Sequence, residues 1–288
     1  MNTSSPFKRS FDSVYELLES IQQPTDLLPE QRSSIVGTKT FTGTKTLEEA
    51  IDLAERGWDE GVDLLRRMHA EIEEMLEGQI PVPEVQYDVI GDVADIGRAV
   101  TGDPEFMMEM VDFGLRRDAP IAKVVHMVYN MSAGGAASKD TMLRRAAAMC
   151  VAADVLERHG VRCKIDVVYI SAPSPDLNDK RPRAEVTVTV KPENEYLSFD
   201  KLAFLMGHRS SLRRVMFAVM EHMDPEVRKS LGIGRGTGGY GFPNSASEHG
   251  DVYMEAMLTN VDWSEKFTTS WLRQTLKKHG LVLREEDV

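Results

Sequence analysis

One apolar run followed by a small-residue loop constrains the fold of this chain more than any other feature. Residues Ile121–Ser132 (IAKVVHMVYNMS) are almost continuously apolar, which is typical of a β-strand buried on both faces. The loop Ala133–Ala137 follows, and Ser138 then stands at the expected N-cap of a long helix that reaches His159 and ends at Gly160. A buried strand that leads into a helix in this way predicts an α/β fold with an open sheet flanked by helices.

Two further strand patterns follow that helix and support the same fold class. Val161–Ile170 alternates apolar with charged residues, and Ala184–Val190 (AEVTVTV) alternates even more regularly. Alternation of this kind is typical of a strand with one covered face and one exposed face. We therefore expect Ala184–Val190 to be a half-exposed strand at the edge of the sheet.

The composition divides the chain into three regions. Residues 1–45 are rich in Ser, Thr, Gln and Pro, and we expect a flexible N-terminal arm that orders only against another surface. Residues 46–118 are expected to be mostly helical. Residues 119–288 are expected to form the α/β domain, with helices toward its C-terminal end.

The helical region begins with a clear start signal and continues with mixed patterns. Thr46 and Glu49 have the spacing of a capping box, and apolar residues then recur at helical intervals. Val85–Val89 alternates like a strand and is a candidate to complete the main sheet. Asp92–Val100 and Glu105–Phe113 are expected to be short helices, the second one opened by a proline in its first turn.

Composition and charge restrict the class of function. The 288 residues carry a formal net charge of −12, which opposes general binding to nucleic-acid phosphates. No apolar run approaches the ~20 residues that a membrane span requires, and residues 1–12 lack a signal-peptide core. Cys150 and Cys163 have neither disulfide-framework nor metal-ligand spacing. We expect an acidic cytoplasmic protein of a bacterial or phage-infected cell, without membrane or nucleic-acid partners.

The junction between the apolar strand and its helix is the strongest candidate for a ligand site. Asn130, Ser132, Gly134 and Gly135 lie where the strand ends, and open α/β sheets bind their ligands at the carboxyl ends of strands. The amides of such a loop and of the following helix N-terminus favour an anion or a metal-linked carboxylate. These four residues are therefore the first candidates for binding a ligand or a partner.

The strand, the short Ser/Gly loop, the long helix, the second strand and the antiparallel strand, in that order, resemble the first half of a von Willebrand factor A domain. The resemblance covers about residues 121–191 and implies a Rossmann-like open sheet, here with a helical N-terminal extension. Members of that family often carry Asp-x-Ser-x-Ser at this loop and use it to hold magnesium or manganese. The corresponding positions here are Asn130, Ser132 and Gly134, so only the first serine position matches.

The resemblance thus implies a degenerate metal site. Asn130 can offer an amide oxygen without charge and Ser132 a hydroxyl, whereas Gly134 offers no side chain for a Mg²⁺ ion. A hard divalent cation prefers at least one carboxylate ligand. Asp166 and Asp176 are the candidates, although neither belongs to a known metal-binding motif.

Four arginines form a second group of candidates. Arg209, Arg213 and Arg214 lie at the start of a predicted helix, and guanidinium groups suit carboxylates and phosphates, although pairing with nearby acidic helices is the alternative. Arg235 lies in the glycine-rich loop Gly232–Gly241, which is either part of a site or a mobile surface loop. That loop lacks Gly-Lys-Ser/Thr and a preceding strand, so it is neither a P-loop nor a dinucleotide fingerprint.

No catalytic signature accompanies these candidates, since the chain has no Gly-x-Ser-x-Gly elbow and no HExxH pair. The favoured hypothesis is a non-enzymatic interaction or assembly protein that binds other proteins, or copies of itself as a homo-oligomer, through Asn130–Gly135 and the acidic N-terminal helices. The chain is also similar in character to proteins encoded by phages and mobile elements. The alternatives are a nucleotide- or anion-binding enzyme that uses Arg209–Arg214 and the Gly232–Gly241 loop, and a nucleic-acid-processing factor.

Overall fold

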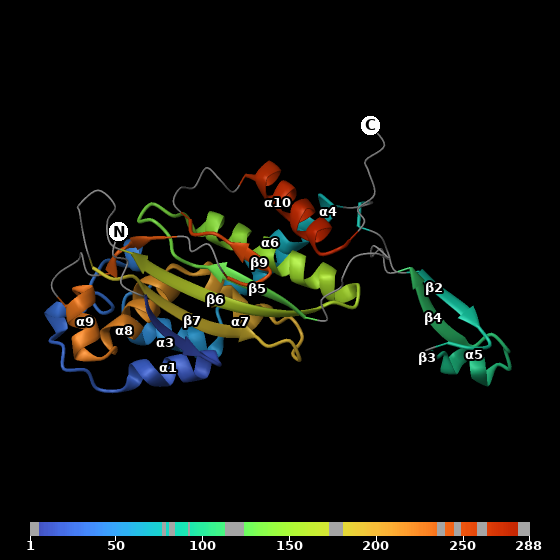
Figure 1. Ribbon diagram of the computed structural model, residues 1–288, viewed down its shortest axis with the longest axis horizontal. Coiled ribbons are helices and arrows are strands. Elements are labelled where there is room, and N and C mark those ends of the chain that lie inside the picture. The colour runs from blue at the N-terminus through green and yellow to red at the C-terminus, as the bar shows by residue number, and fades with distance from the viewer. Residues whose placement is uncertain are drawn as a thin grey trace.

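A computed structural model of the chain describes residues 6–76, 79–80, 84–91, 93–112, 124–172, 181–234, 240–244, 249–257 and 264–281. Its centre is an open, mixed and mostly parallel sheet (Figure 1). The strand order is β1-β7-β6-β5-β9, and β8 pairs with one end of β6. The bounds are β1 Phe7–Phe11, β5 Val124–Asn130, β6 Arg162–Ala172, β7 Ala184–Lys191, β8 Phe242–Pro243 and β9 Val252–Met254.

Strand β5 lies inside the sheet, next to the edge strand β9. Strand β5 runs parallel to both of its neighbours, β6 and β9, so its carboxyl end lies between two strands. Strand β7 is antiparallel to β6, and β1 is parallel to β7. The α/β class predicted from the sequence is therefore confirmed.

Helices supply the rest of the fold. They are α1 Val14–Gln22, η1 Pro29–Gln31, α2 Lys39–Thr42, α3 Leu47–Arg56, α4 Asp59–Glu74, α6 Lys139–Arg158, α7 Phe199–Gly207, the π-helical turn η3 Ser211–Met216, α8 Phe217–Glu221, α9 Pro225–Leu231 and α10 Glu265–Lys278. Among the described helices, none is at once long enough and apolar enough to traverse a lipid bilayer.

The ends of helix α6 were predictable from the sequence because capping residues mark both of them. The Ser138 hydroxyl accepts a hydrogen bond from the Thr141 amide at 3.0 Å, which satisfies one of the free donors of the first turn. Gly160 adopts φ 81° just beyond the helix, a conformation that glycine tolerates best. The small residues Ala146–Ala148 are fully buried, so α6 packs closely on its neighbours.

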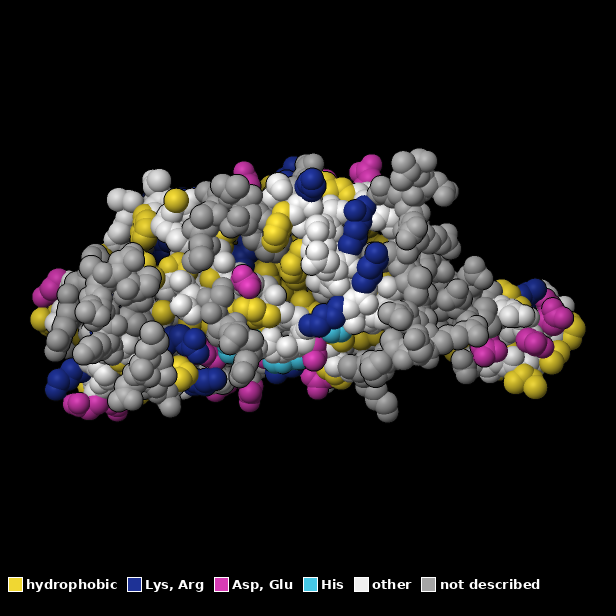
Figure 2. Space-filling model, turned by 45° about the horizontal axis from the view of Figure 1, so that its top comes forward, with side chains coloured by type: hydrophobic (Ala, Val, Ile, Leu, Met, Phe, Trp, Pro, Cys, Tyr) yellow, Lys and Arg dark blue, Asp and Glu magenta, His cyan; other side chains and the backbone are white. Residues whose placement is uncertain are grey.

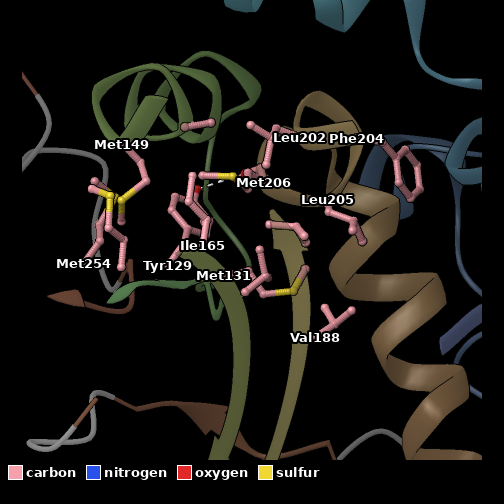
Figure 3. Close-up of a cluster of buried hydrophobic side chains, with 14 of the residues drawn as sticks. Tyr129, Met131, Met149, Ile165, Val188, Leu202, Phe204, Leu205, Met206 and Met254 are labelled. Atoms are coloured by element: carbon pink, nitrogen blue, oxygen red, sulfur yellow. Dashed lines mark hydrogen bonds between the residues drawn. The ribbon is translucent and has the colours of Figure 1, made fainter. Parts of the chain in front are cut away.

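One large hydrophobic core joins the helices to the sheet. Tyr129, Ile165 and Val188 come from three adjacent strands and share this core with Leu202 and Phe204 of α7 (Figure 3). The other side of the strands carries a much smaller apolar cluster of Val128, Val168 and Ile170, with Tyr253 packed against it.

Strand β7 is not the half-exposed edge strand that its alternation predicts. Strand β1 pairs with residues 184–188 of β7, and Glu185 and Lys191 are only 4% and 2% exposed. The Lys191 ammonium pairs with Glu157 at 2.5 Å and Glu185 pairs with Lys8 at 3.4 Å, so these two polar positions form ion pairs, while Thr187 and Thr189 are half-buried. The N-terminal segment that forms this edge was not recognisable as a strand.

The segment expected to be a flexible arm packs on the rest of the chain from residue 6 to residue 45. Besides β1, it contributes α1, whose Leu17, Leu18 and Ile21 enter the main core. Ser34, Thr42 and Thr44 are buried polar residues of the same segment. Their side chains or backbone oxygens hydrogen-bond to residues of η3 and α8, as described below.

Residues 84–112, called the projection here, form a separate small sheet of order β2-β4-β3 that stands away from the main body (Figure 1). Its elements are β2 Glu84–Asp88, β3 Val93–Ala94, α5 Ile96–Val100 and β4 Met107–Asp112. The predicted helix at Glu105–Phe113 is therefore wrong over its described part, because this segment pairs as β4 with β2. The strand at Val85–Val89 exists, but it does not complete the main sheet.

Candidate functional site

A cavity of about 460 Å³ lies at the carboxyl end of β5, where the sequence places its strongest candidate residues. Its floor is the loop after β5, and its other walls come from distant parts of the chain. The lining consists of Ser33, Val36, Gly37, Phe41, Ser132, Ala133, Gly134, Gly135, Tyr169, Leu212, Arg213, Phe217, Tyr240, Gly241, Phe242 and Pro243. A volume of this size is in the range of pockets that bind small ligands or inserted side chains.

Asn130 lies behind the cavity rather than in its wall. It is fully buried, its amide oxygen accepts from the Ser132 amide at 2.9 Å, and its amide nitrogen donates to the Tyr253 hydroxyl at 2.7 Å. The same nitrogen donates to the Asn244 carbonyl at 2.8 Å. Asn130 therefore fixes the turn after β5 and joins it to β9.

Ser132 lines the cavity, but its hydroxyl belongs to the sheet. The hydroxyl donates to the Ile170 carbonyl at 3.1 Å and accepts from the Ile170 amide at 2.7 Å. These two hydrogen bonds to one residue of β6 extend the pairing of the strands beyond the last residue of β5. The side chain is 1% exposed, so it shapes the wall without offering a free ligand atom.

Arg213 holds the glycine loop in place. One guanidinium nitrogen donates to the carbonyls of Gly134 and Gly135, each at 3.1 Å, and the other donates to the Phe41 carbonyl. The guanidinium also lies 4.2 Å from the centre of the Phe41 ring. Burial, reinforced by nearby Arg209, lowers the pKa of Arg213 to about 10, so it remains charged at neutral pH.

Aromatic rings form the wall opposite the glycine loop. Phe217 and Tyr240 stack with ring centres 4.3 Å apart, and the Tyr169 hydroxyl donates to the Tyr240 carbonyl at 2.8 Å. Burial raises the pKa of both tyrosines, so their hydroxyls stay protonated and act as donors. Phe41 stands at the rim and is 47% exposed.

A buried carboxylate that the sequence did not reveal supports this wall. Glu221 of α8 is fully buried and accepts hydrogen bonds from the Tyr240 hydroxyl and from both the amide and the hydroxyl of Ser34. Arg32 adds a charged donor, with its Nε 3.1 Å from the carboxylate. The four donors tie the N-terminal segment, α8 and the aromatic wall together.

The arginines proposed from the sequence do not converge on one pocket. Arg213 lines the cavity, whereas Arg214 is fully buried and donates to the carbonyls of Ser34, Val36 and Lys45, among others. Arg209 donates to the Thr40 carbonyl at 3.0 Å and lines a different, more open pocket. Arg235 lies outside the described residues. The described guanidiniums thus bind backbone oxygens of this chain and hold its N-terminal segment.

The described donor set does not fit a magnesium or manganese ion. Asn130 and Ser132 are buried, their side-chain oxygens already accept protein hydrogen bonds, and neither brings a charge. Asp166 lies farther back along β6, where its carboxylate pairs with His126 at 2.7 Å and with Lys164 at 3.2 Å. Asp176 lies outside the described residues. A hard cation needs free oxygen ligands and a compensating charge, so no metal-dependent step is assigned to this loop.

The described lining of the cavity offers apolar surface and few free polar groups. Its described lining contains no carboxylate, histidine or cysteine, and its buried polar side chains are hydrogen-bonded within the protein. Sequence reasoning found Ser132, Gly134, Gly135 and Arg213. The Gly232–Gly241 loop, also a candidate from the sequence, contributes Tyr240 and Gly241. Sequence reasoning missed Phe41 and Phe217, because Phe41 lies in a Thr/Lys/Gly-rich segment without periodicity and no local pattern brings it to β5.

Comparison with known proteins gives one positive result. The model of a family described as "Domain of unknown function (DUF7192)" matches residues 2–282, which is nearly the whole chain. No curated protein and no solved structure matches the chain. The match covers the main sheet, the projection and the cavity as parts of one family domain.

Proposed function

We propose that this chain, which belongs to the DUF7192 family, is a non-enzymatic protein-interaction module that accepts an apolar side chain of a partner in the cavity at the end of β5. The observation that carries the proposal is the chemistry of the walls. Aromatic rings and a glycine loop enclose the space, and the polar groups around it are already paired. Anchoring of one buried aromatic or aliphatic side chain in such a pocket is typical of protein interfaces.

The arrangement of the main sheet also favours a von Willebrand A-like core as our interpretation of the fold. Strand β5, the loop Ala133–Ala137, helix α6, strand β6 and the antiparallel strand β7 follow one another as that resemblance implies. The cavity lies at the loop where members of that family often hold a metal ion. Two of the three metal-ligand positions of that family are occupied here by Asn130 and Gly134. We propose that the loop still binds a partner, through apolar contact instead of a metal ion.

The enzymatic alternative has less support. An anion-binding enzyme would bring guanidiniums together around an open pocket, and the described arginines instead donate to backbone carbonyls of residues 34–45 and of the glycine loop. We therefore do not assign a reaction to this site.

The proposal is tested with a variant that fills the cavity. A Cβ atom placed on Gly135 would meet only the Phe41 ring, at 4.0 Å, so Gly135→Trp is expected to fold while its indole occupies the space. A random peptide library would be selected on the wild-type protein, and binding of the selected peptides would be measured by fluorescence polarisation with both proteins.

We expect selected peptides to share an aromatic or large aliphatic residue and to bind Gly135→Trp at least about tenfold more weakly, which corresponds to about 1.4 kcal/mol. The matched control is Lys229→Trp at an exposed position of α9, which leaves the cavity open. If the peptides bind Gly135→Trp as tightly as the wild type, the cavity is not the binding site and the proposal fails.

A further inference from the structure

The projection exposes several large apolar side chains. Val89, Ile90, Val93, Ile96 and Val100 are between 58% and 81% exposed, and they all lie near its outer end. None of the projection residues whose burial is described is buried. A lone three-stranded sheet with one turn of helix has no core of its own, so its shape depends on other contacts.

Polar interactions give the projection a defined shape despite this missing core. Arg98 lies 3.9 Å from the centre of the Tyr87 ring and pairs with Asp103 at 2.8 Å. The Asp95 carboxylate accepts from the Arg98 amide at 3.1 Å and so caps α5. The exposed apolar residues are therefore presented on a preformed unit, as expected for a contact surface.

The charge of the projection narrows the choice of partner. Residues 84–112 include eight acidic residues (Glu84, Asp88, Asp92, Asp95, Asp103, Glu105, Glu109 and Asp112) and a single base, Arg98. Two such projections would repel each other, so a symmetric projection-to-projection contact is disfavoured. The partner surface must combine apolar area with positive charge.

Helix α10 provides such a surface on the same chain. Its sequence (EKFTTSWLRQTLKK) carries four basic residues and one acidic residue. Lys266, Lys277 and Lys278 are exposed, and Phe267 is 43% exposed beside them. Figure 2 shows a row of Lys and Arg side chains across the middle of this face, while yellow and magenta side chains mark the projection at the far right.

We propose that the projection of one copy docks on the basic outer face of α10 of a second copy. Within the described residues, the strands of the projection pair only with one another, and α10 packs on α6 while Lys266, Lys277 and Lys278 stay exposed. Because the two surfaces differ, the contact is head-to-tail and builds a ring or a chain of copies. This interface is separate from the cavity at β5 and does not depend on the function proposed for it.

The test uses light scattering coupled to size-exclusion chromatography on full-length variants. Ile90→Asp with Val100→Asp removes the apolar end of the projection, and Lys266→Glu with Lys277→Glu reverses the charge of α10. All four side chains are exposed, so folding is preserved. The charge-matched control is Lys45→Glu with Lys229→Glu, two exposed lysines away from both surfaces.

At low ionic strength we expect the wild type and the control to exceed the chain mass of 32.2 kDa and both test variants to run as monomers. An equimolar mixture of the two test variants should form a dimer. The α10 variant keeps an intact projection and the projection variant keeps an intact α10, so one contact can form between them. A monomeric wild type, an assembled α10 variant, or a mixture that stays monomeric would overturn the proposal. Gly135→Trp should assemble like the wild type, which separates this result from the test of the cavity.

Discussion

At the residue scale, buried charged side chains of η3 and α8 attach the N-terminal segment to the body through hydrogen bonds. In other parts of the chain a periodic apolar pattern provides this attachment. Arg214 and Glu221 are both fully buried, and each binds the N-terminal segment through several hydrogen bonds. Buried ionic groups of this kind are tolerated only when their hydrogen-bonding capacity is largely filled. They explain why a segment poor in apolar residues is nevertheless fixed against the body.

Replacing the buried carboxylate tests this role. Glu221→Gln keeps the shape of the side chain but removes the charge that Arg32 and the Ser34 donors face. We expect the free energy of unfolding to fall by about 2 kcal/mol, the usual cost of weakening charged hydrogen bonds in a buried site. Urea denaturation measures the change, and Glu226→Gln on the exposed face of α9 should leave stability unaltered.

His208 gives a second residue-scale prediction, for the dependence of stability on pH. Burial, together with Lys139, lowers the pKa of His208 to about 4, and its Nδ1 accepts from the Ser210 amide at 3.1 Å. Glu49 and Glu60 act in the opposite direction and Arg209 in the same one. Between pH 6.5 and pH 4 the unfolded chain therefore binds a proton that the folded chain excludes.

Stability is thus complete above pH 6.5 and decreases as the pH falls toward 4, by about 2 to 3 kcal/mol from this group. His208→Asn keeps an acceptor for the Ser210 amide but has no titrating group in this range. We expect chemical denaturation at pH 7 and pH 4.5 to show a smaller stability difference in the variant than in the wild type. Equal differences would contradict the role of His208.

At the element scale, β1 is the clearest departure from what the sequence indicates. It turns β7 from an edge strand into an interior one through a parallel pairing between residues 7–11 and 184–188. Phe11 anchors this strand in the main core with 4% of its surface exposed. The pairing of β1 therefore decides how much of β7 reaches solvent.

Shortening this anchor should destabilise the whole sheet. Phe11→Ala is expected to lower the free energy of unfolding by about 3 kcal/mol, through lost apolar burial and the cavity left behind. Lys8→Ala in the same strand removes only a half-exposed pairing with Glu185 and should cost less than about 1 kcal/mol. Thermal denaturation followed by circular dichroism compares the two, and equal effects would argue against β1 as an anchored strand.

The elements that the sequence identified correctly are those with local signals. Ser138 and Gly160 delimit α6 by capping chemistry, and β5 and β6 follow from their apolar runs. The prediction failed at residues 105–113, where Pro104 is typical of a helix start but Met107–Asp112 pairs with β2 instead. Pairing between distant segments overrides local preference there, and no single-sequence pattern reports it.

Only the part of the candidate site that has a local sequence signal was predictable. Ser132, Gly134 and Gly135 were found because the end of a buried strand marks the ligand edge of an α/β sheet. Phe41, Tyr240 and Glu221 come from other regions of the chain, and only tertiary packing brings them to that edge. The same packing consumes the hydrogen-bonding capacity of Asn130, which the sequence suggested for a ligand.

At the scale of the whole molecule, the chain consists of a well-packed body and a projection with little attachment to it. Since no projection residue whose burial is described is buried, the body should fold without it. Replacing residues 84–112 by a short Gly/Ser linker is expected to change the stability of the body by no more than about 0.5 kcal/mol. Calorimetry tests this, and loss of cooperative unfolding would show that the projection belongs to the core.

The account as a whole depends on the cavity at the end of β5 being a binding site for an apolar side chain. Its most direct test is methyl NMR of the protein titrated with N-acetyl-tryptophanamide, a mimic of one inserted side chain. We predict saturable shifts centred on Val36, Ala133 and Leu212, which line the cavity, and their loss in Gly135→Trp. Shifts located elsewhere, or none at these three residues, would contradict the account.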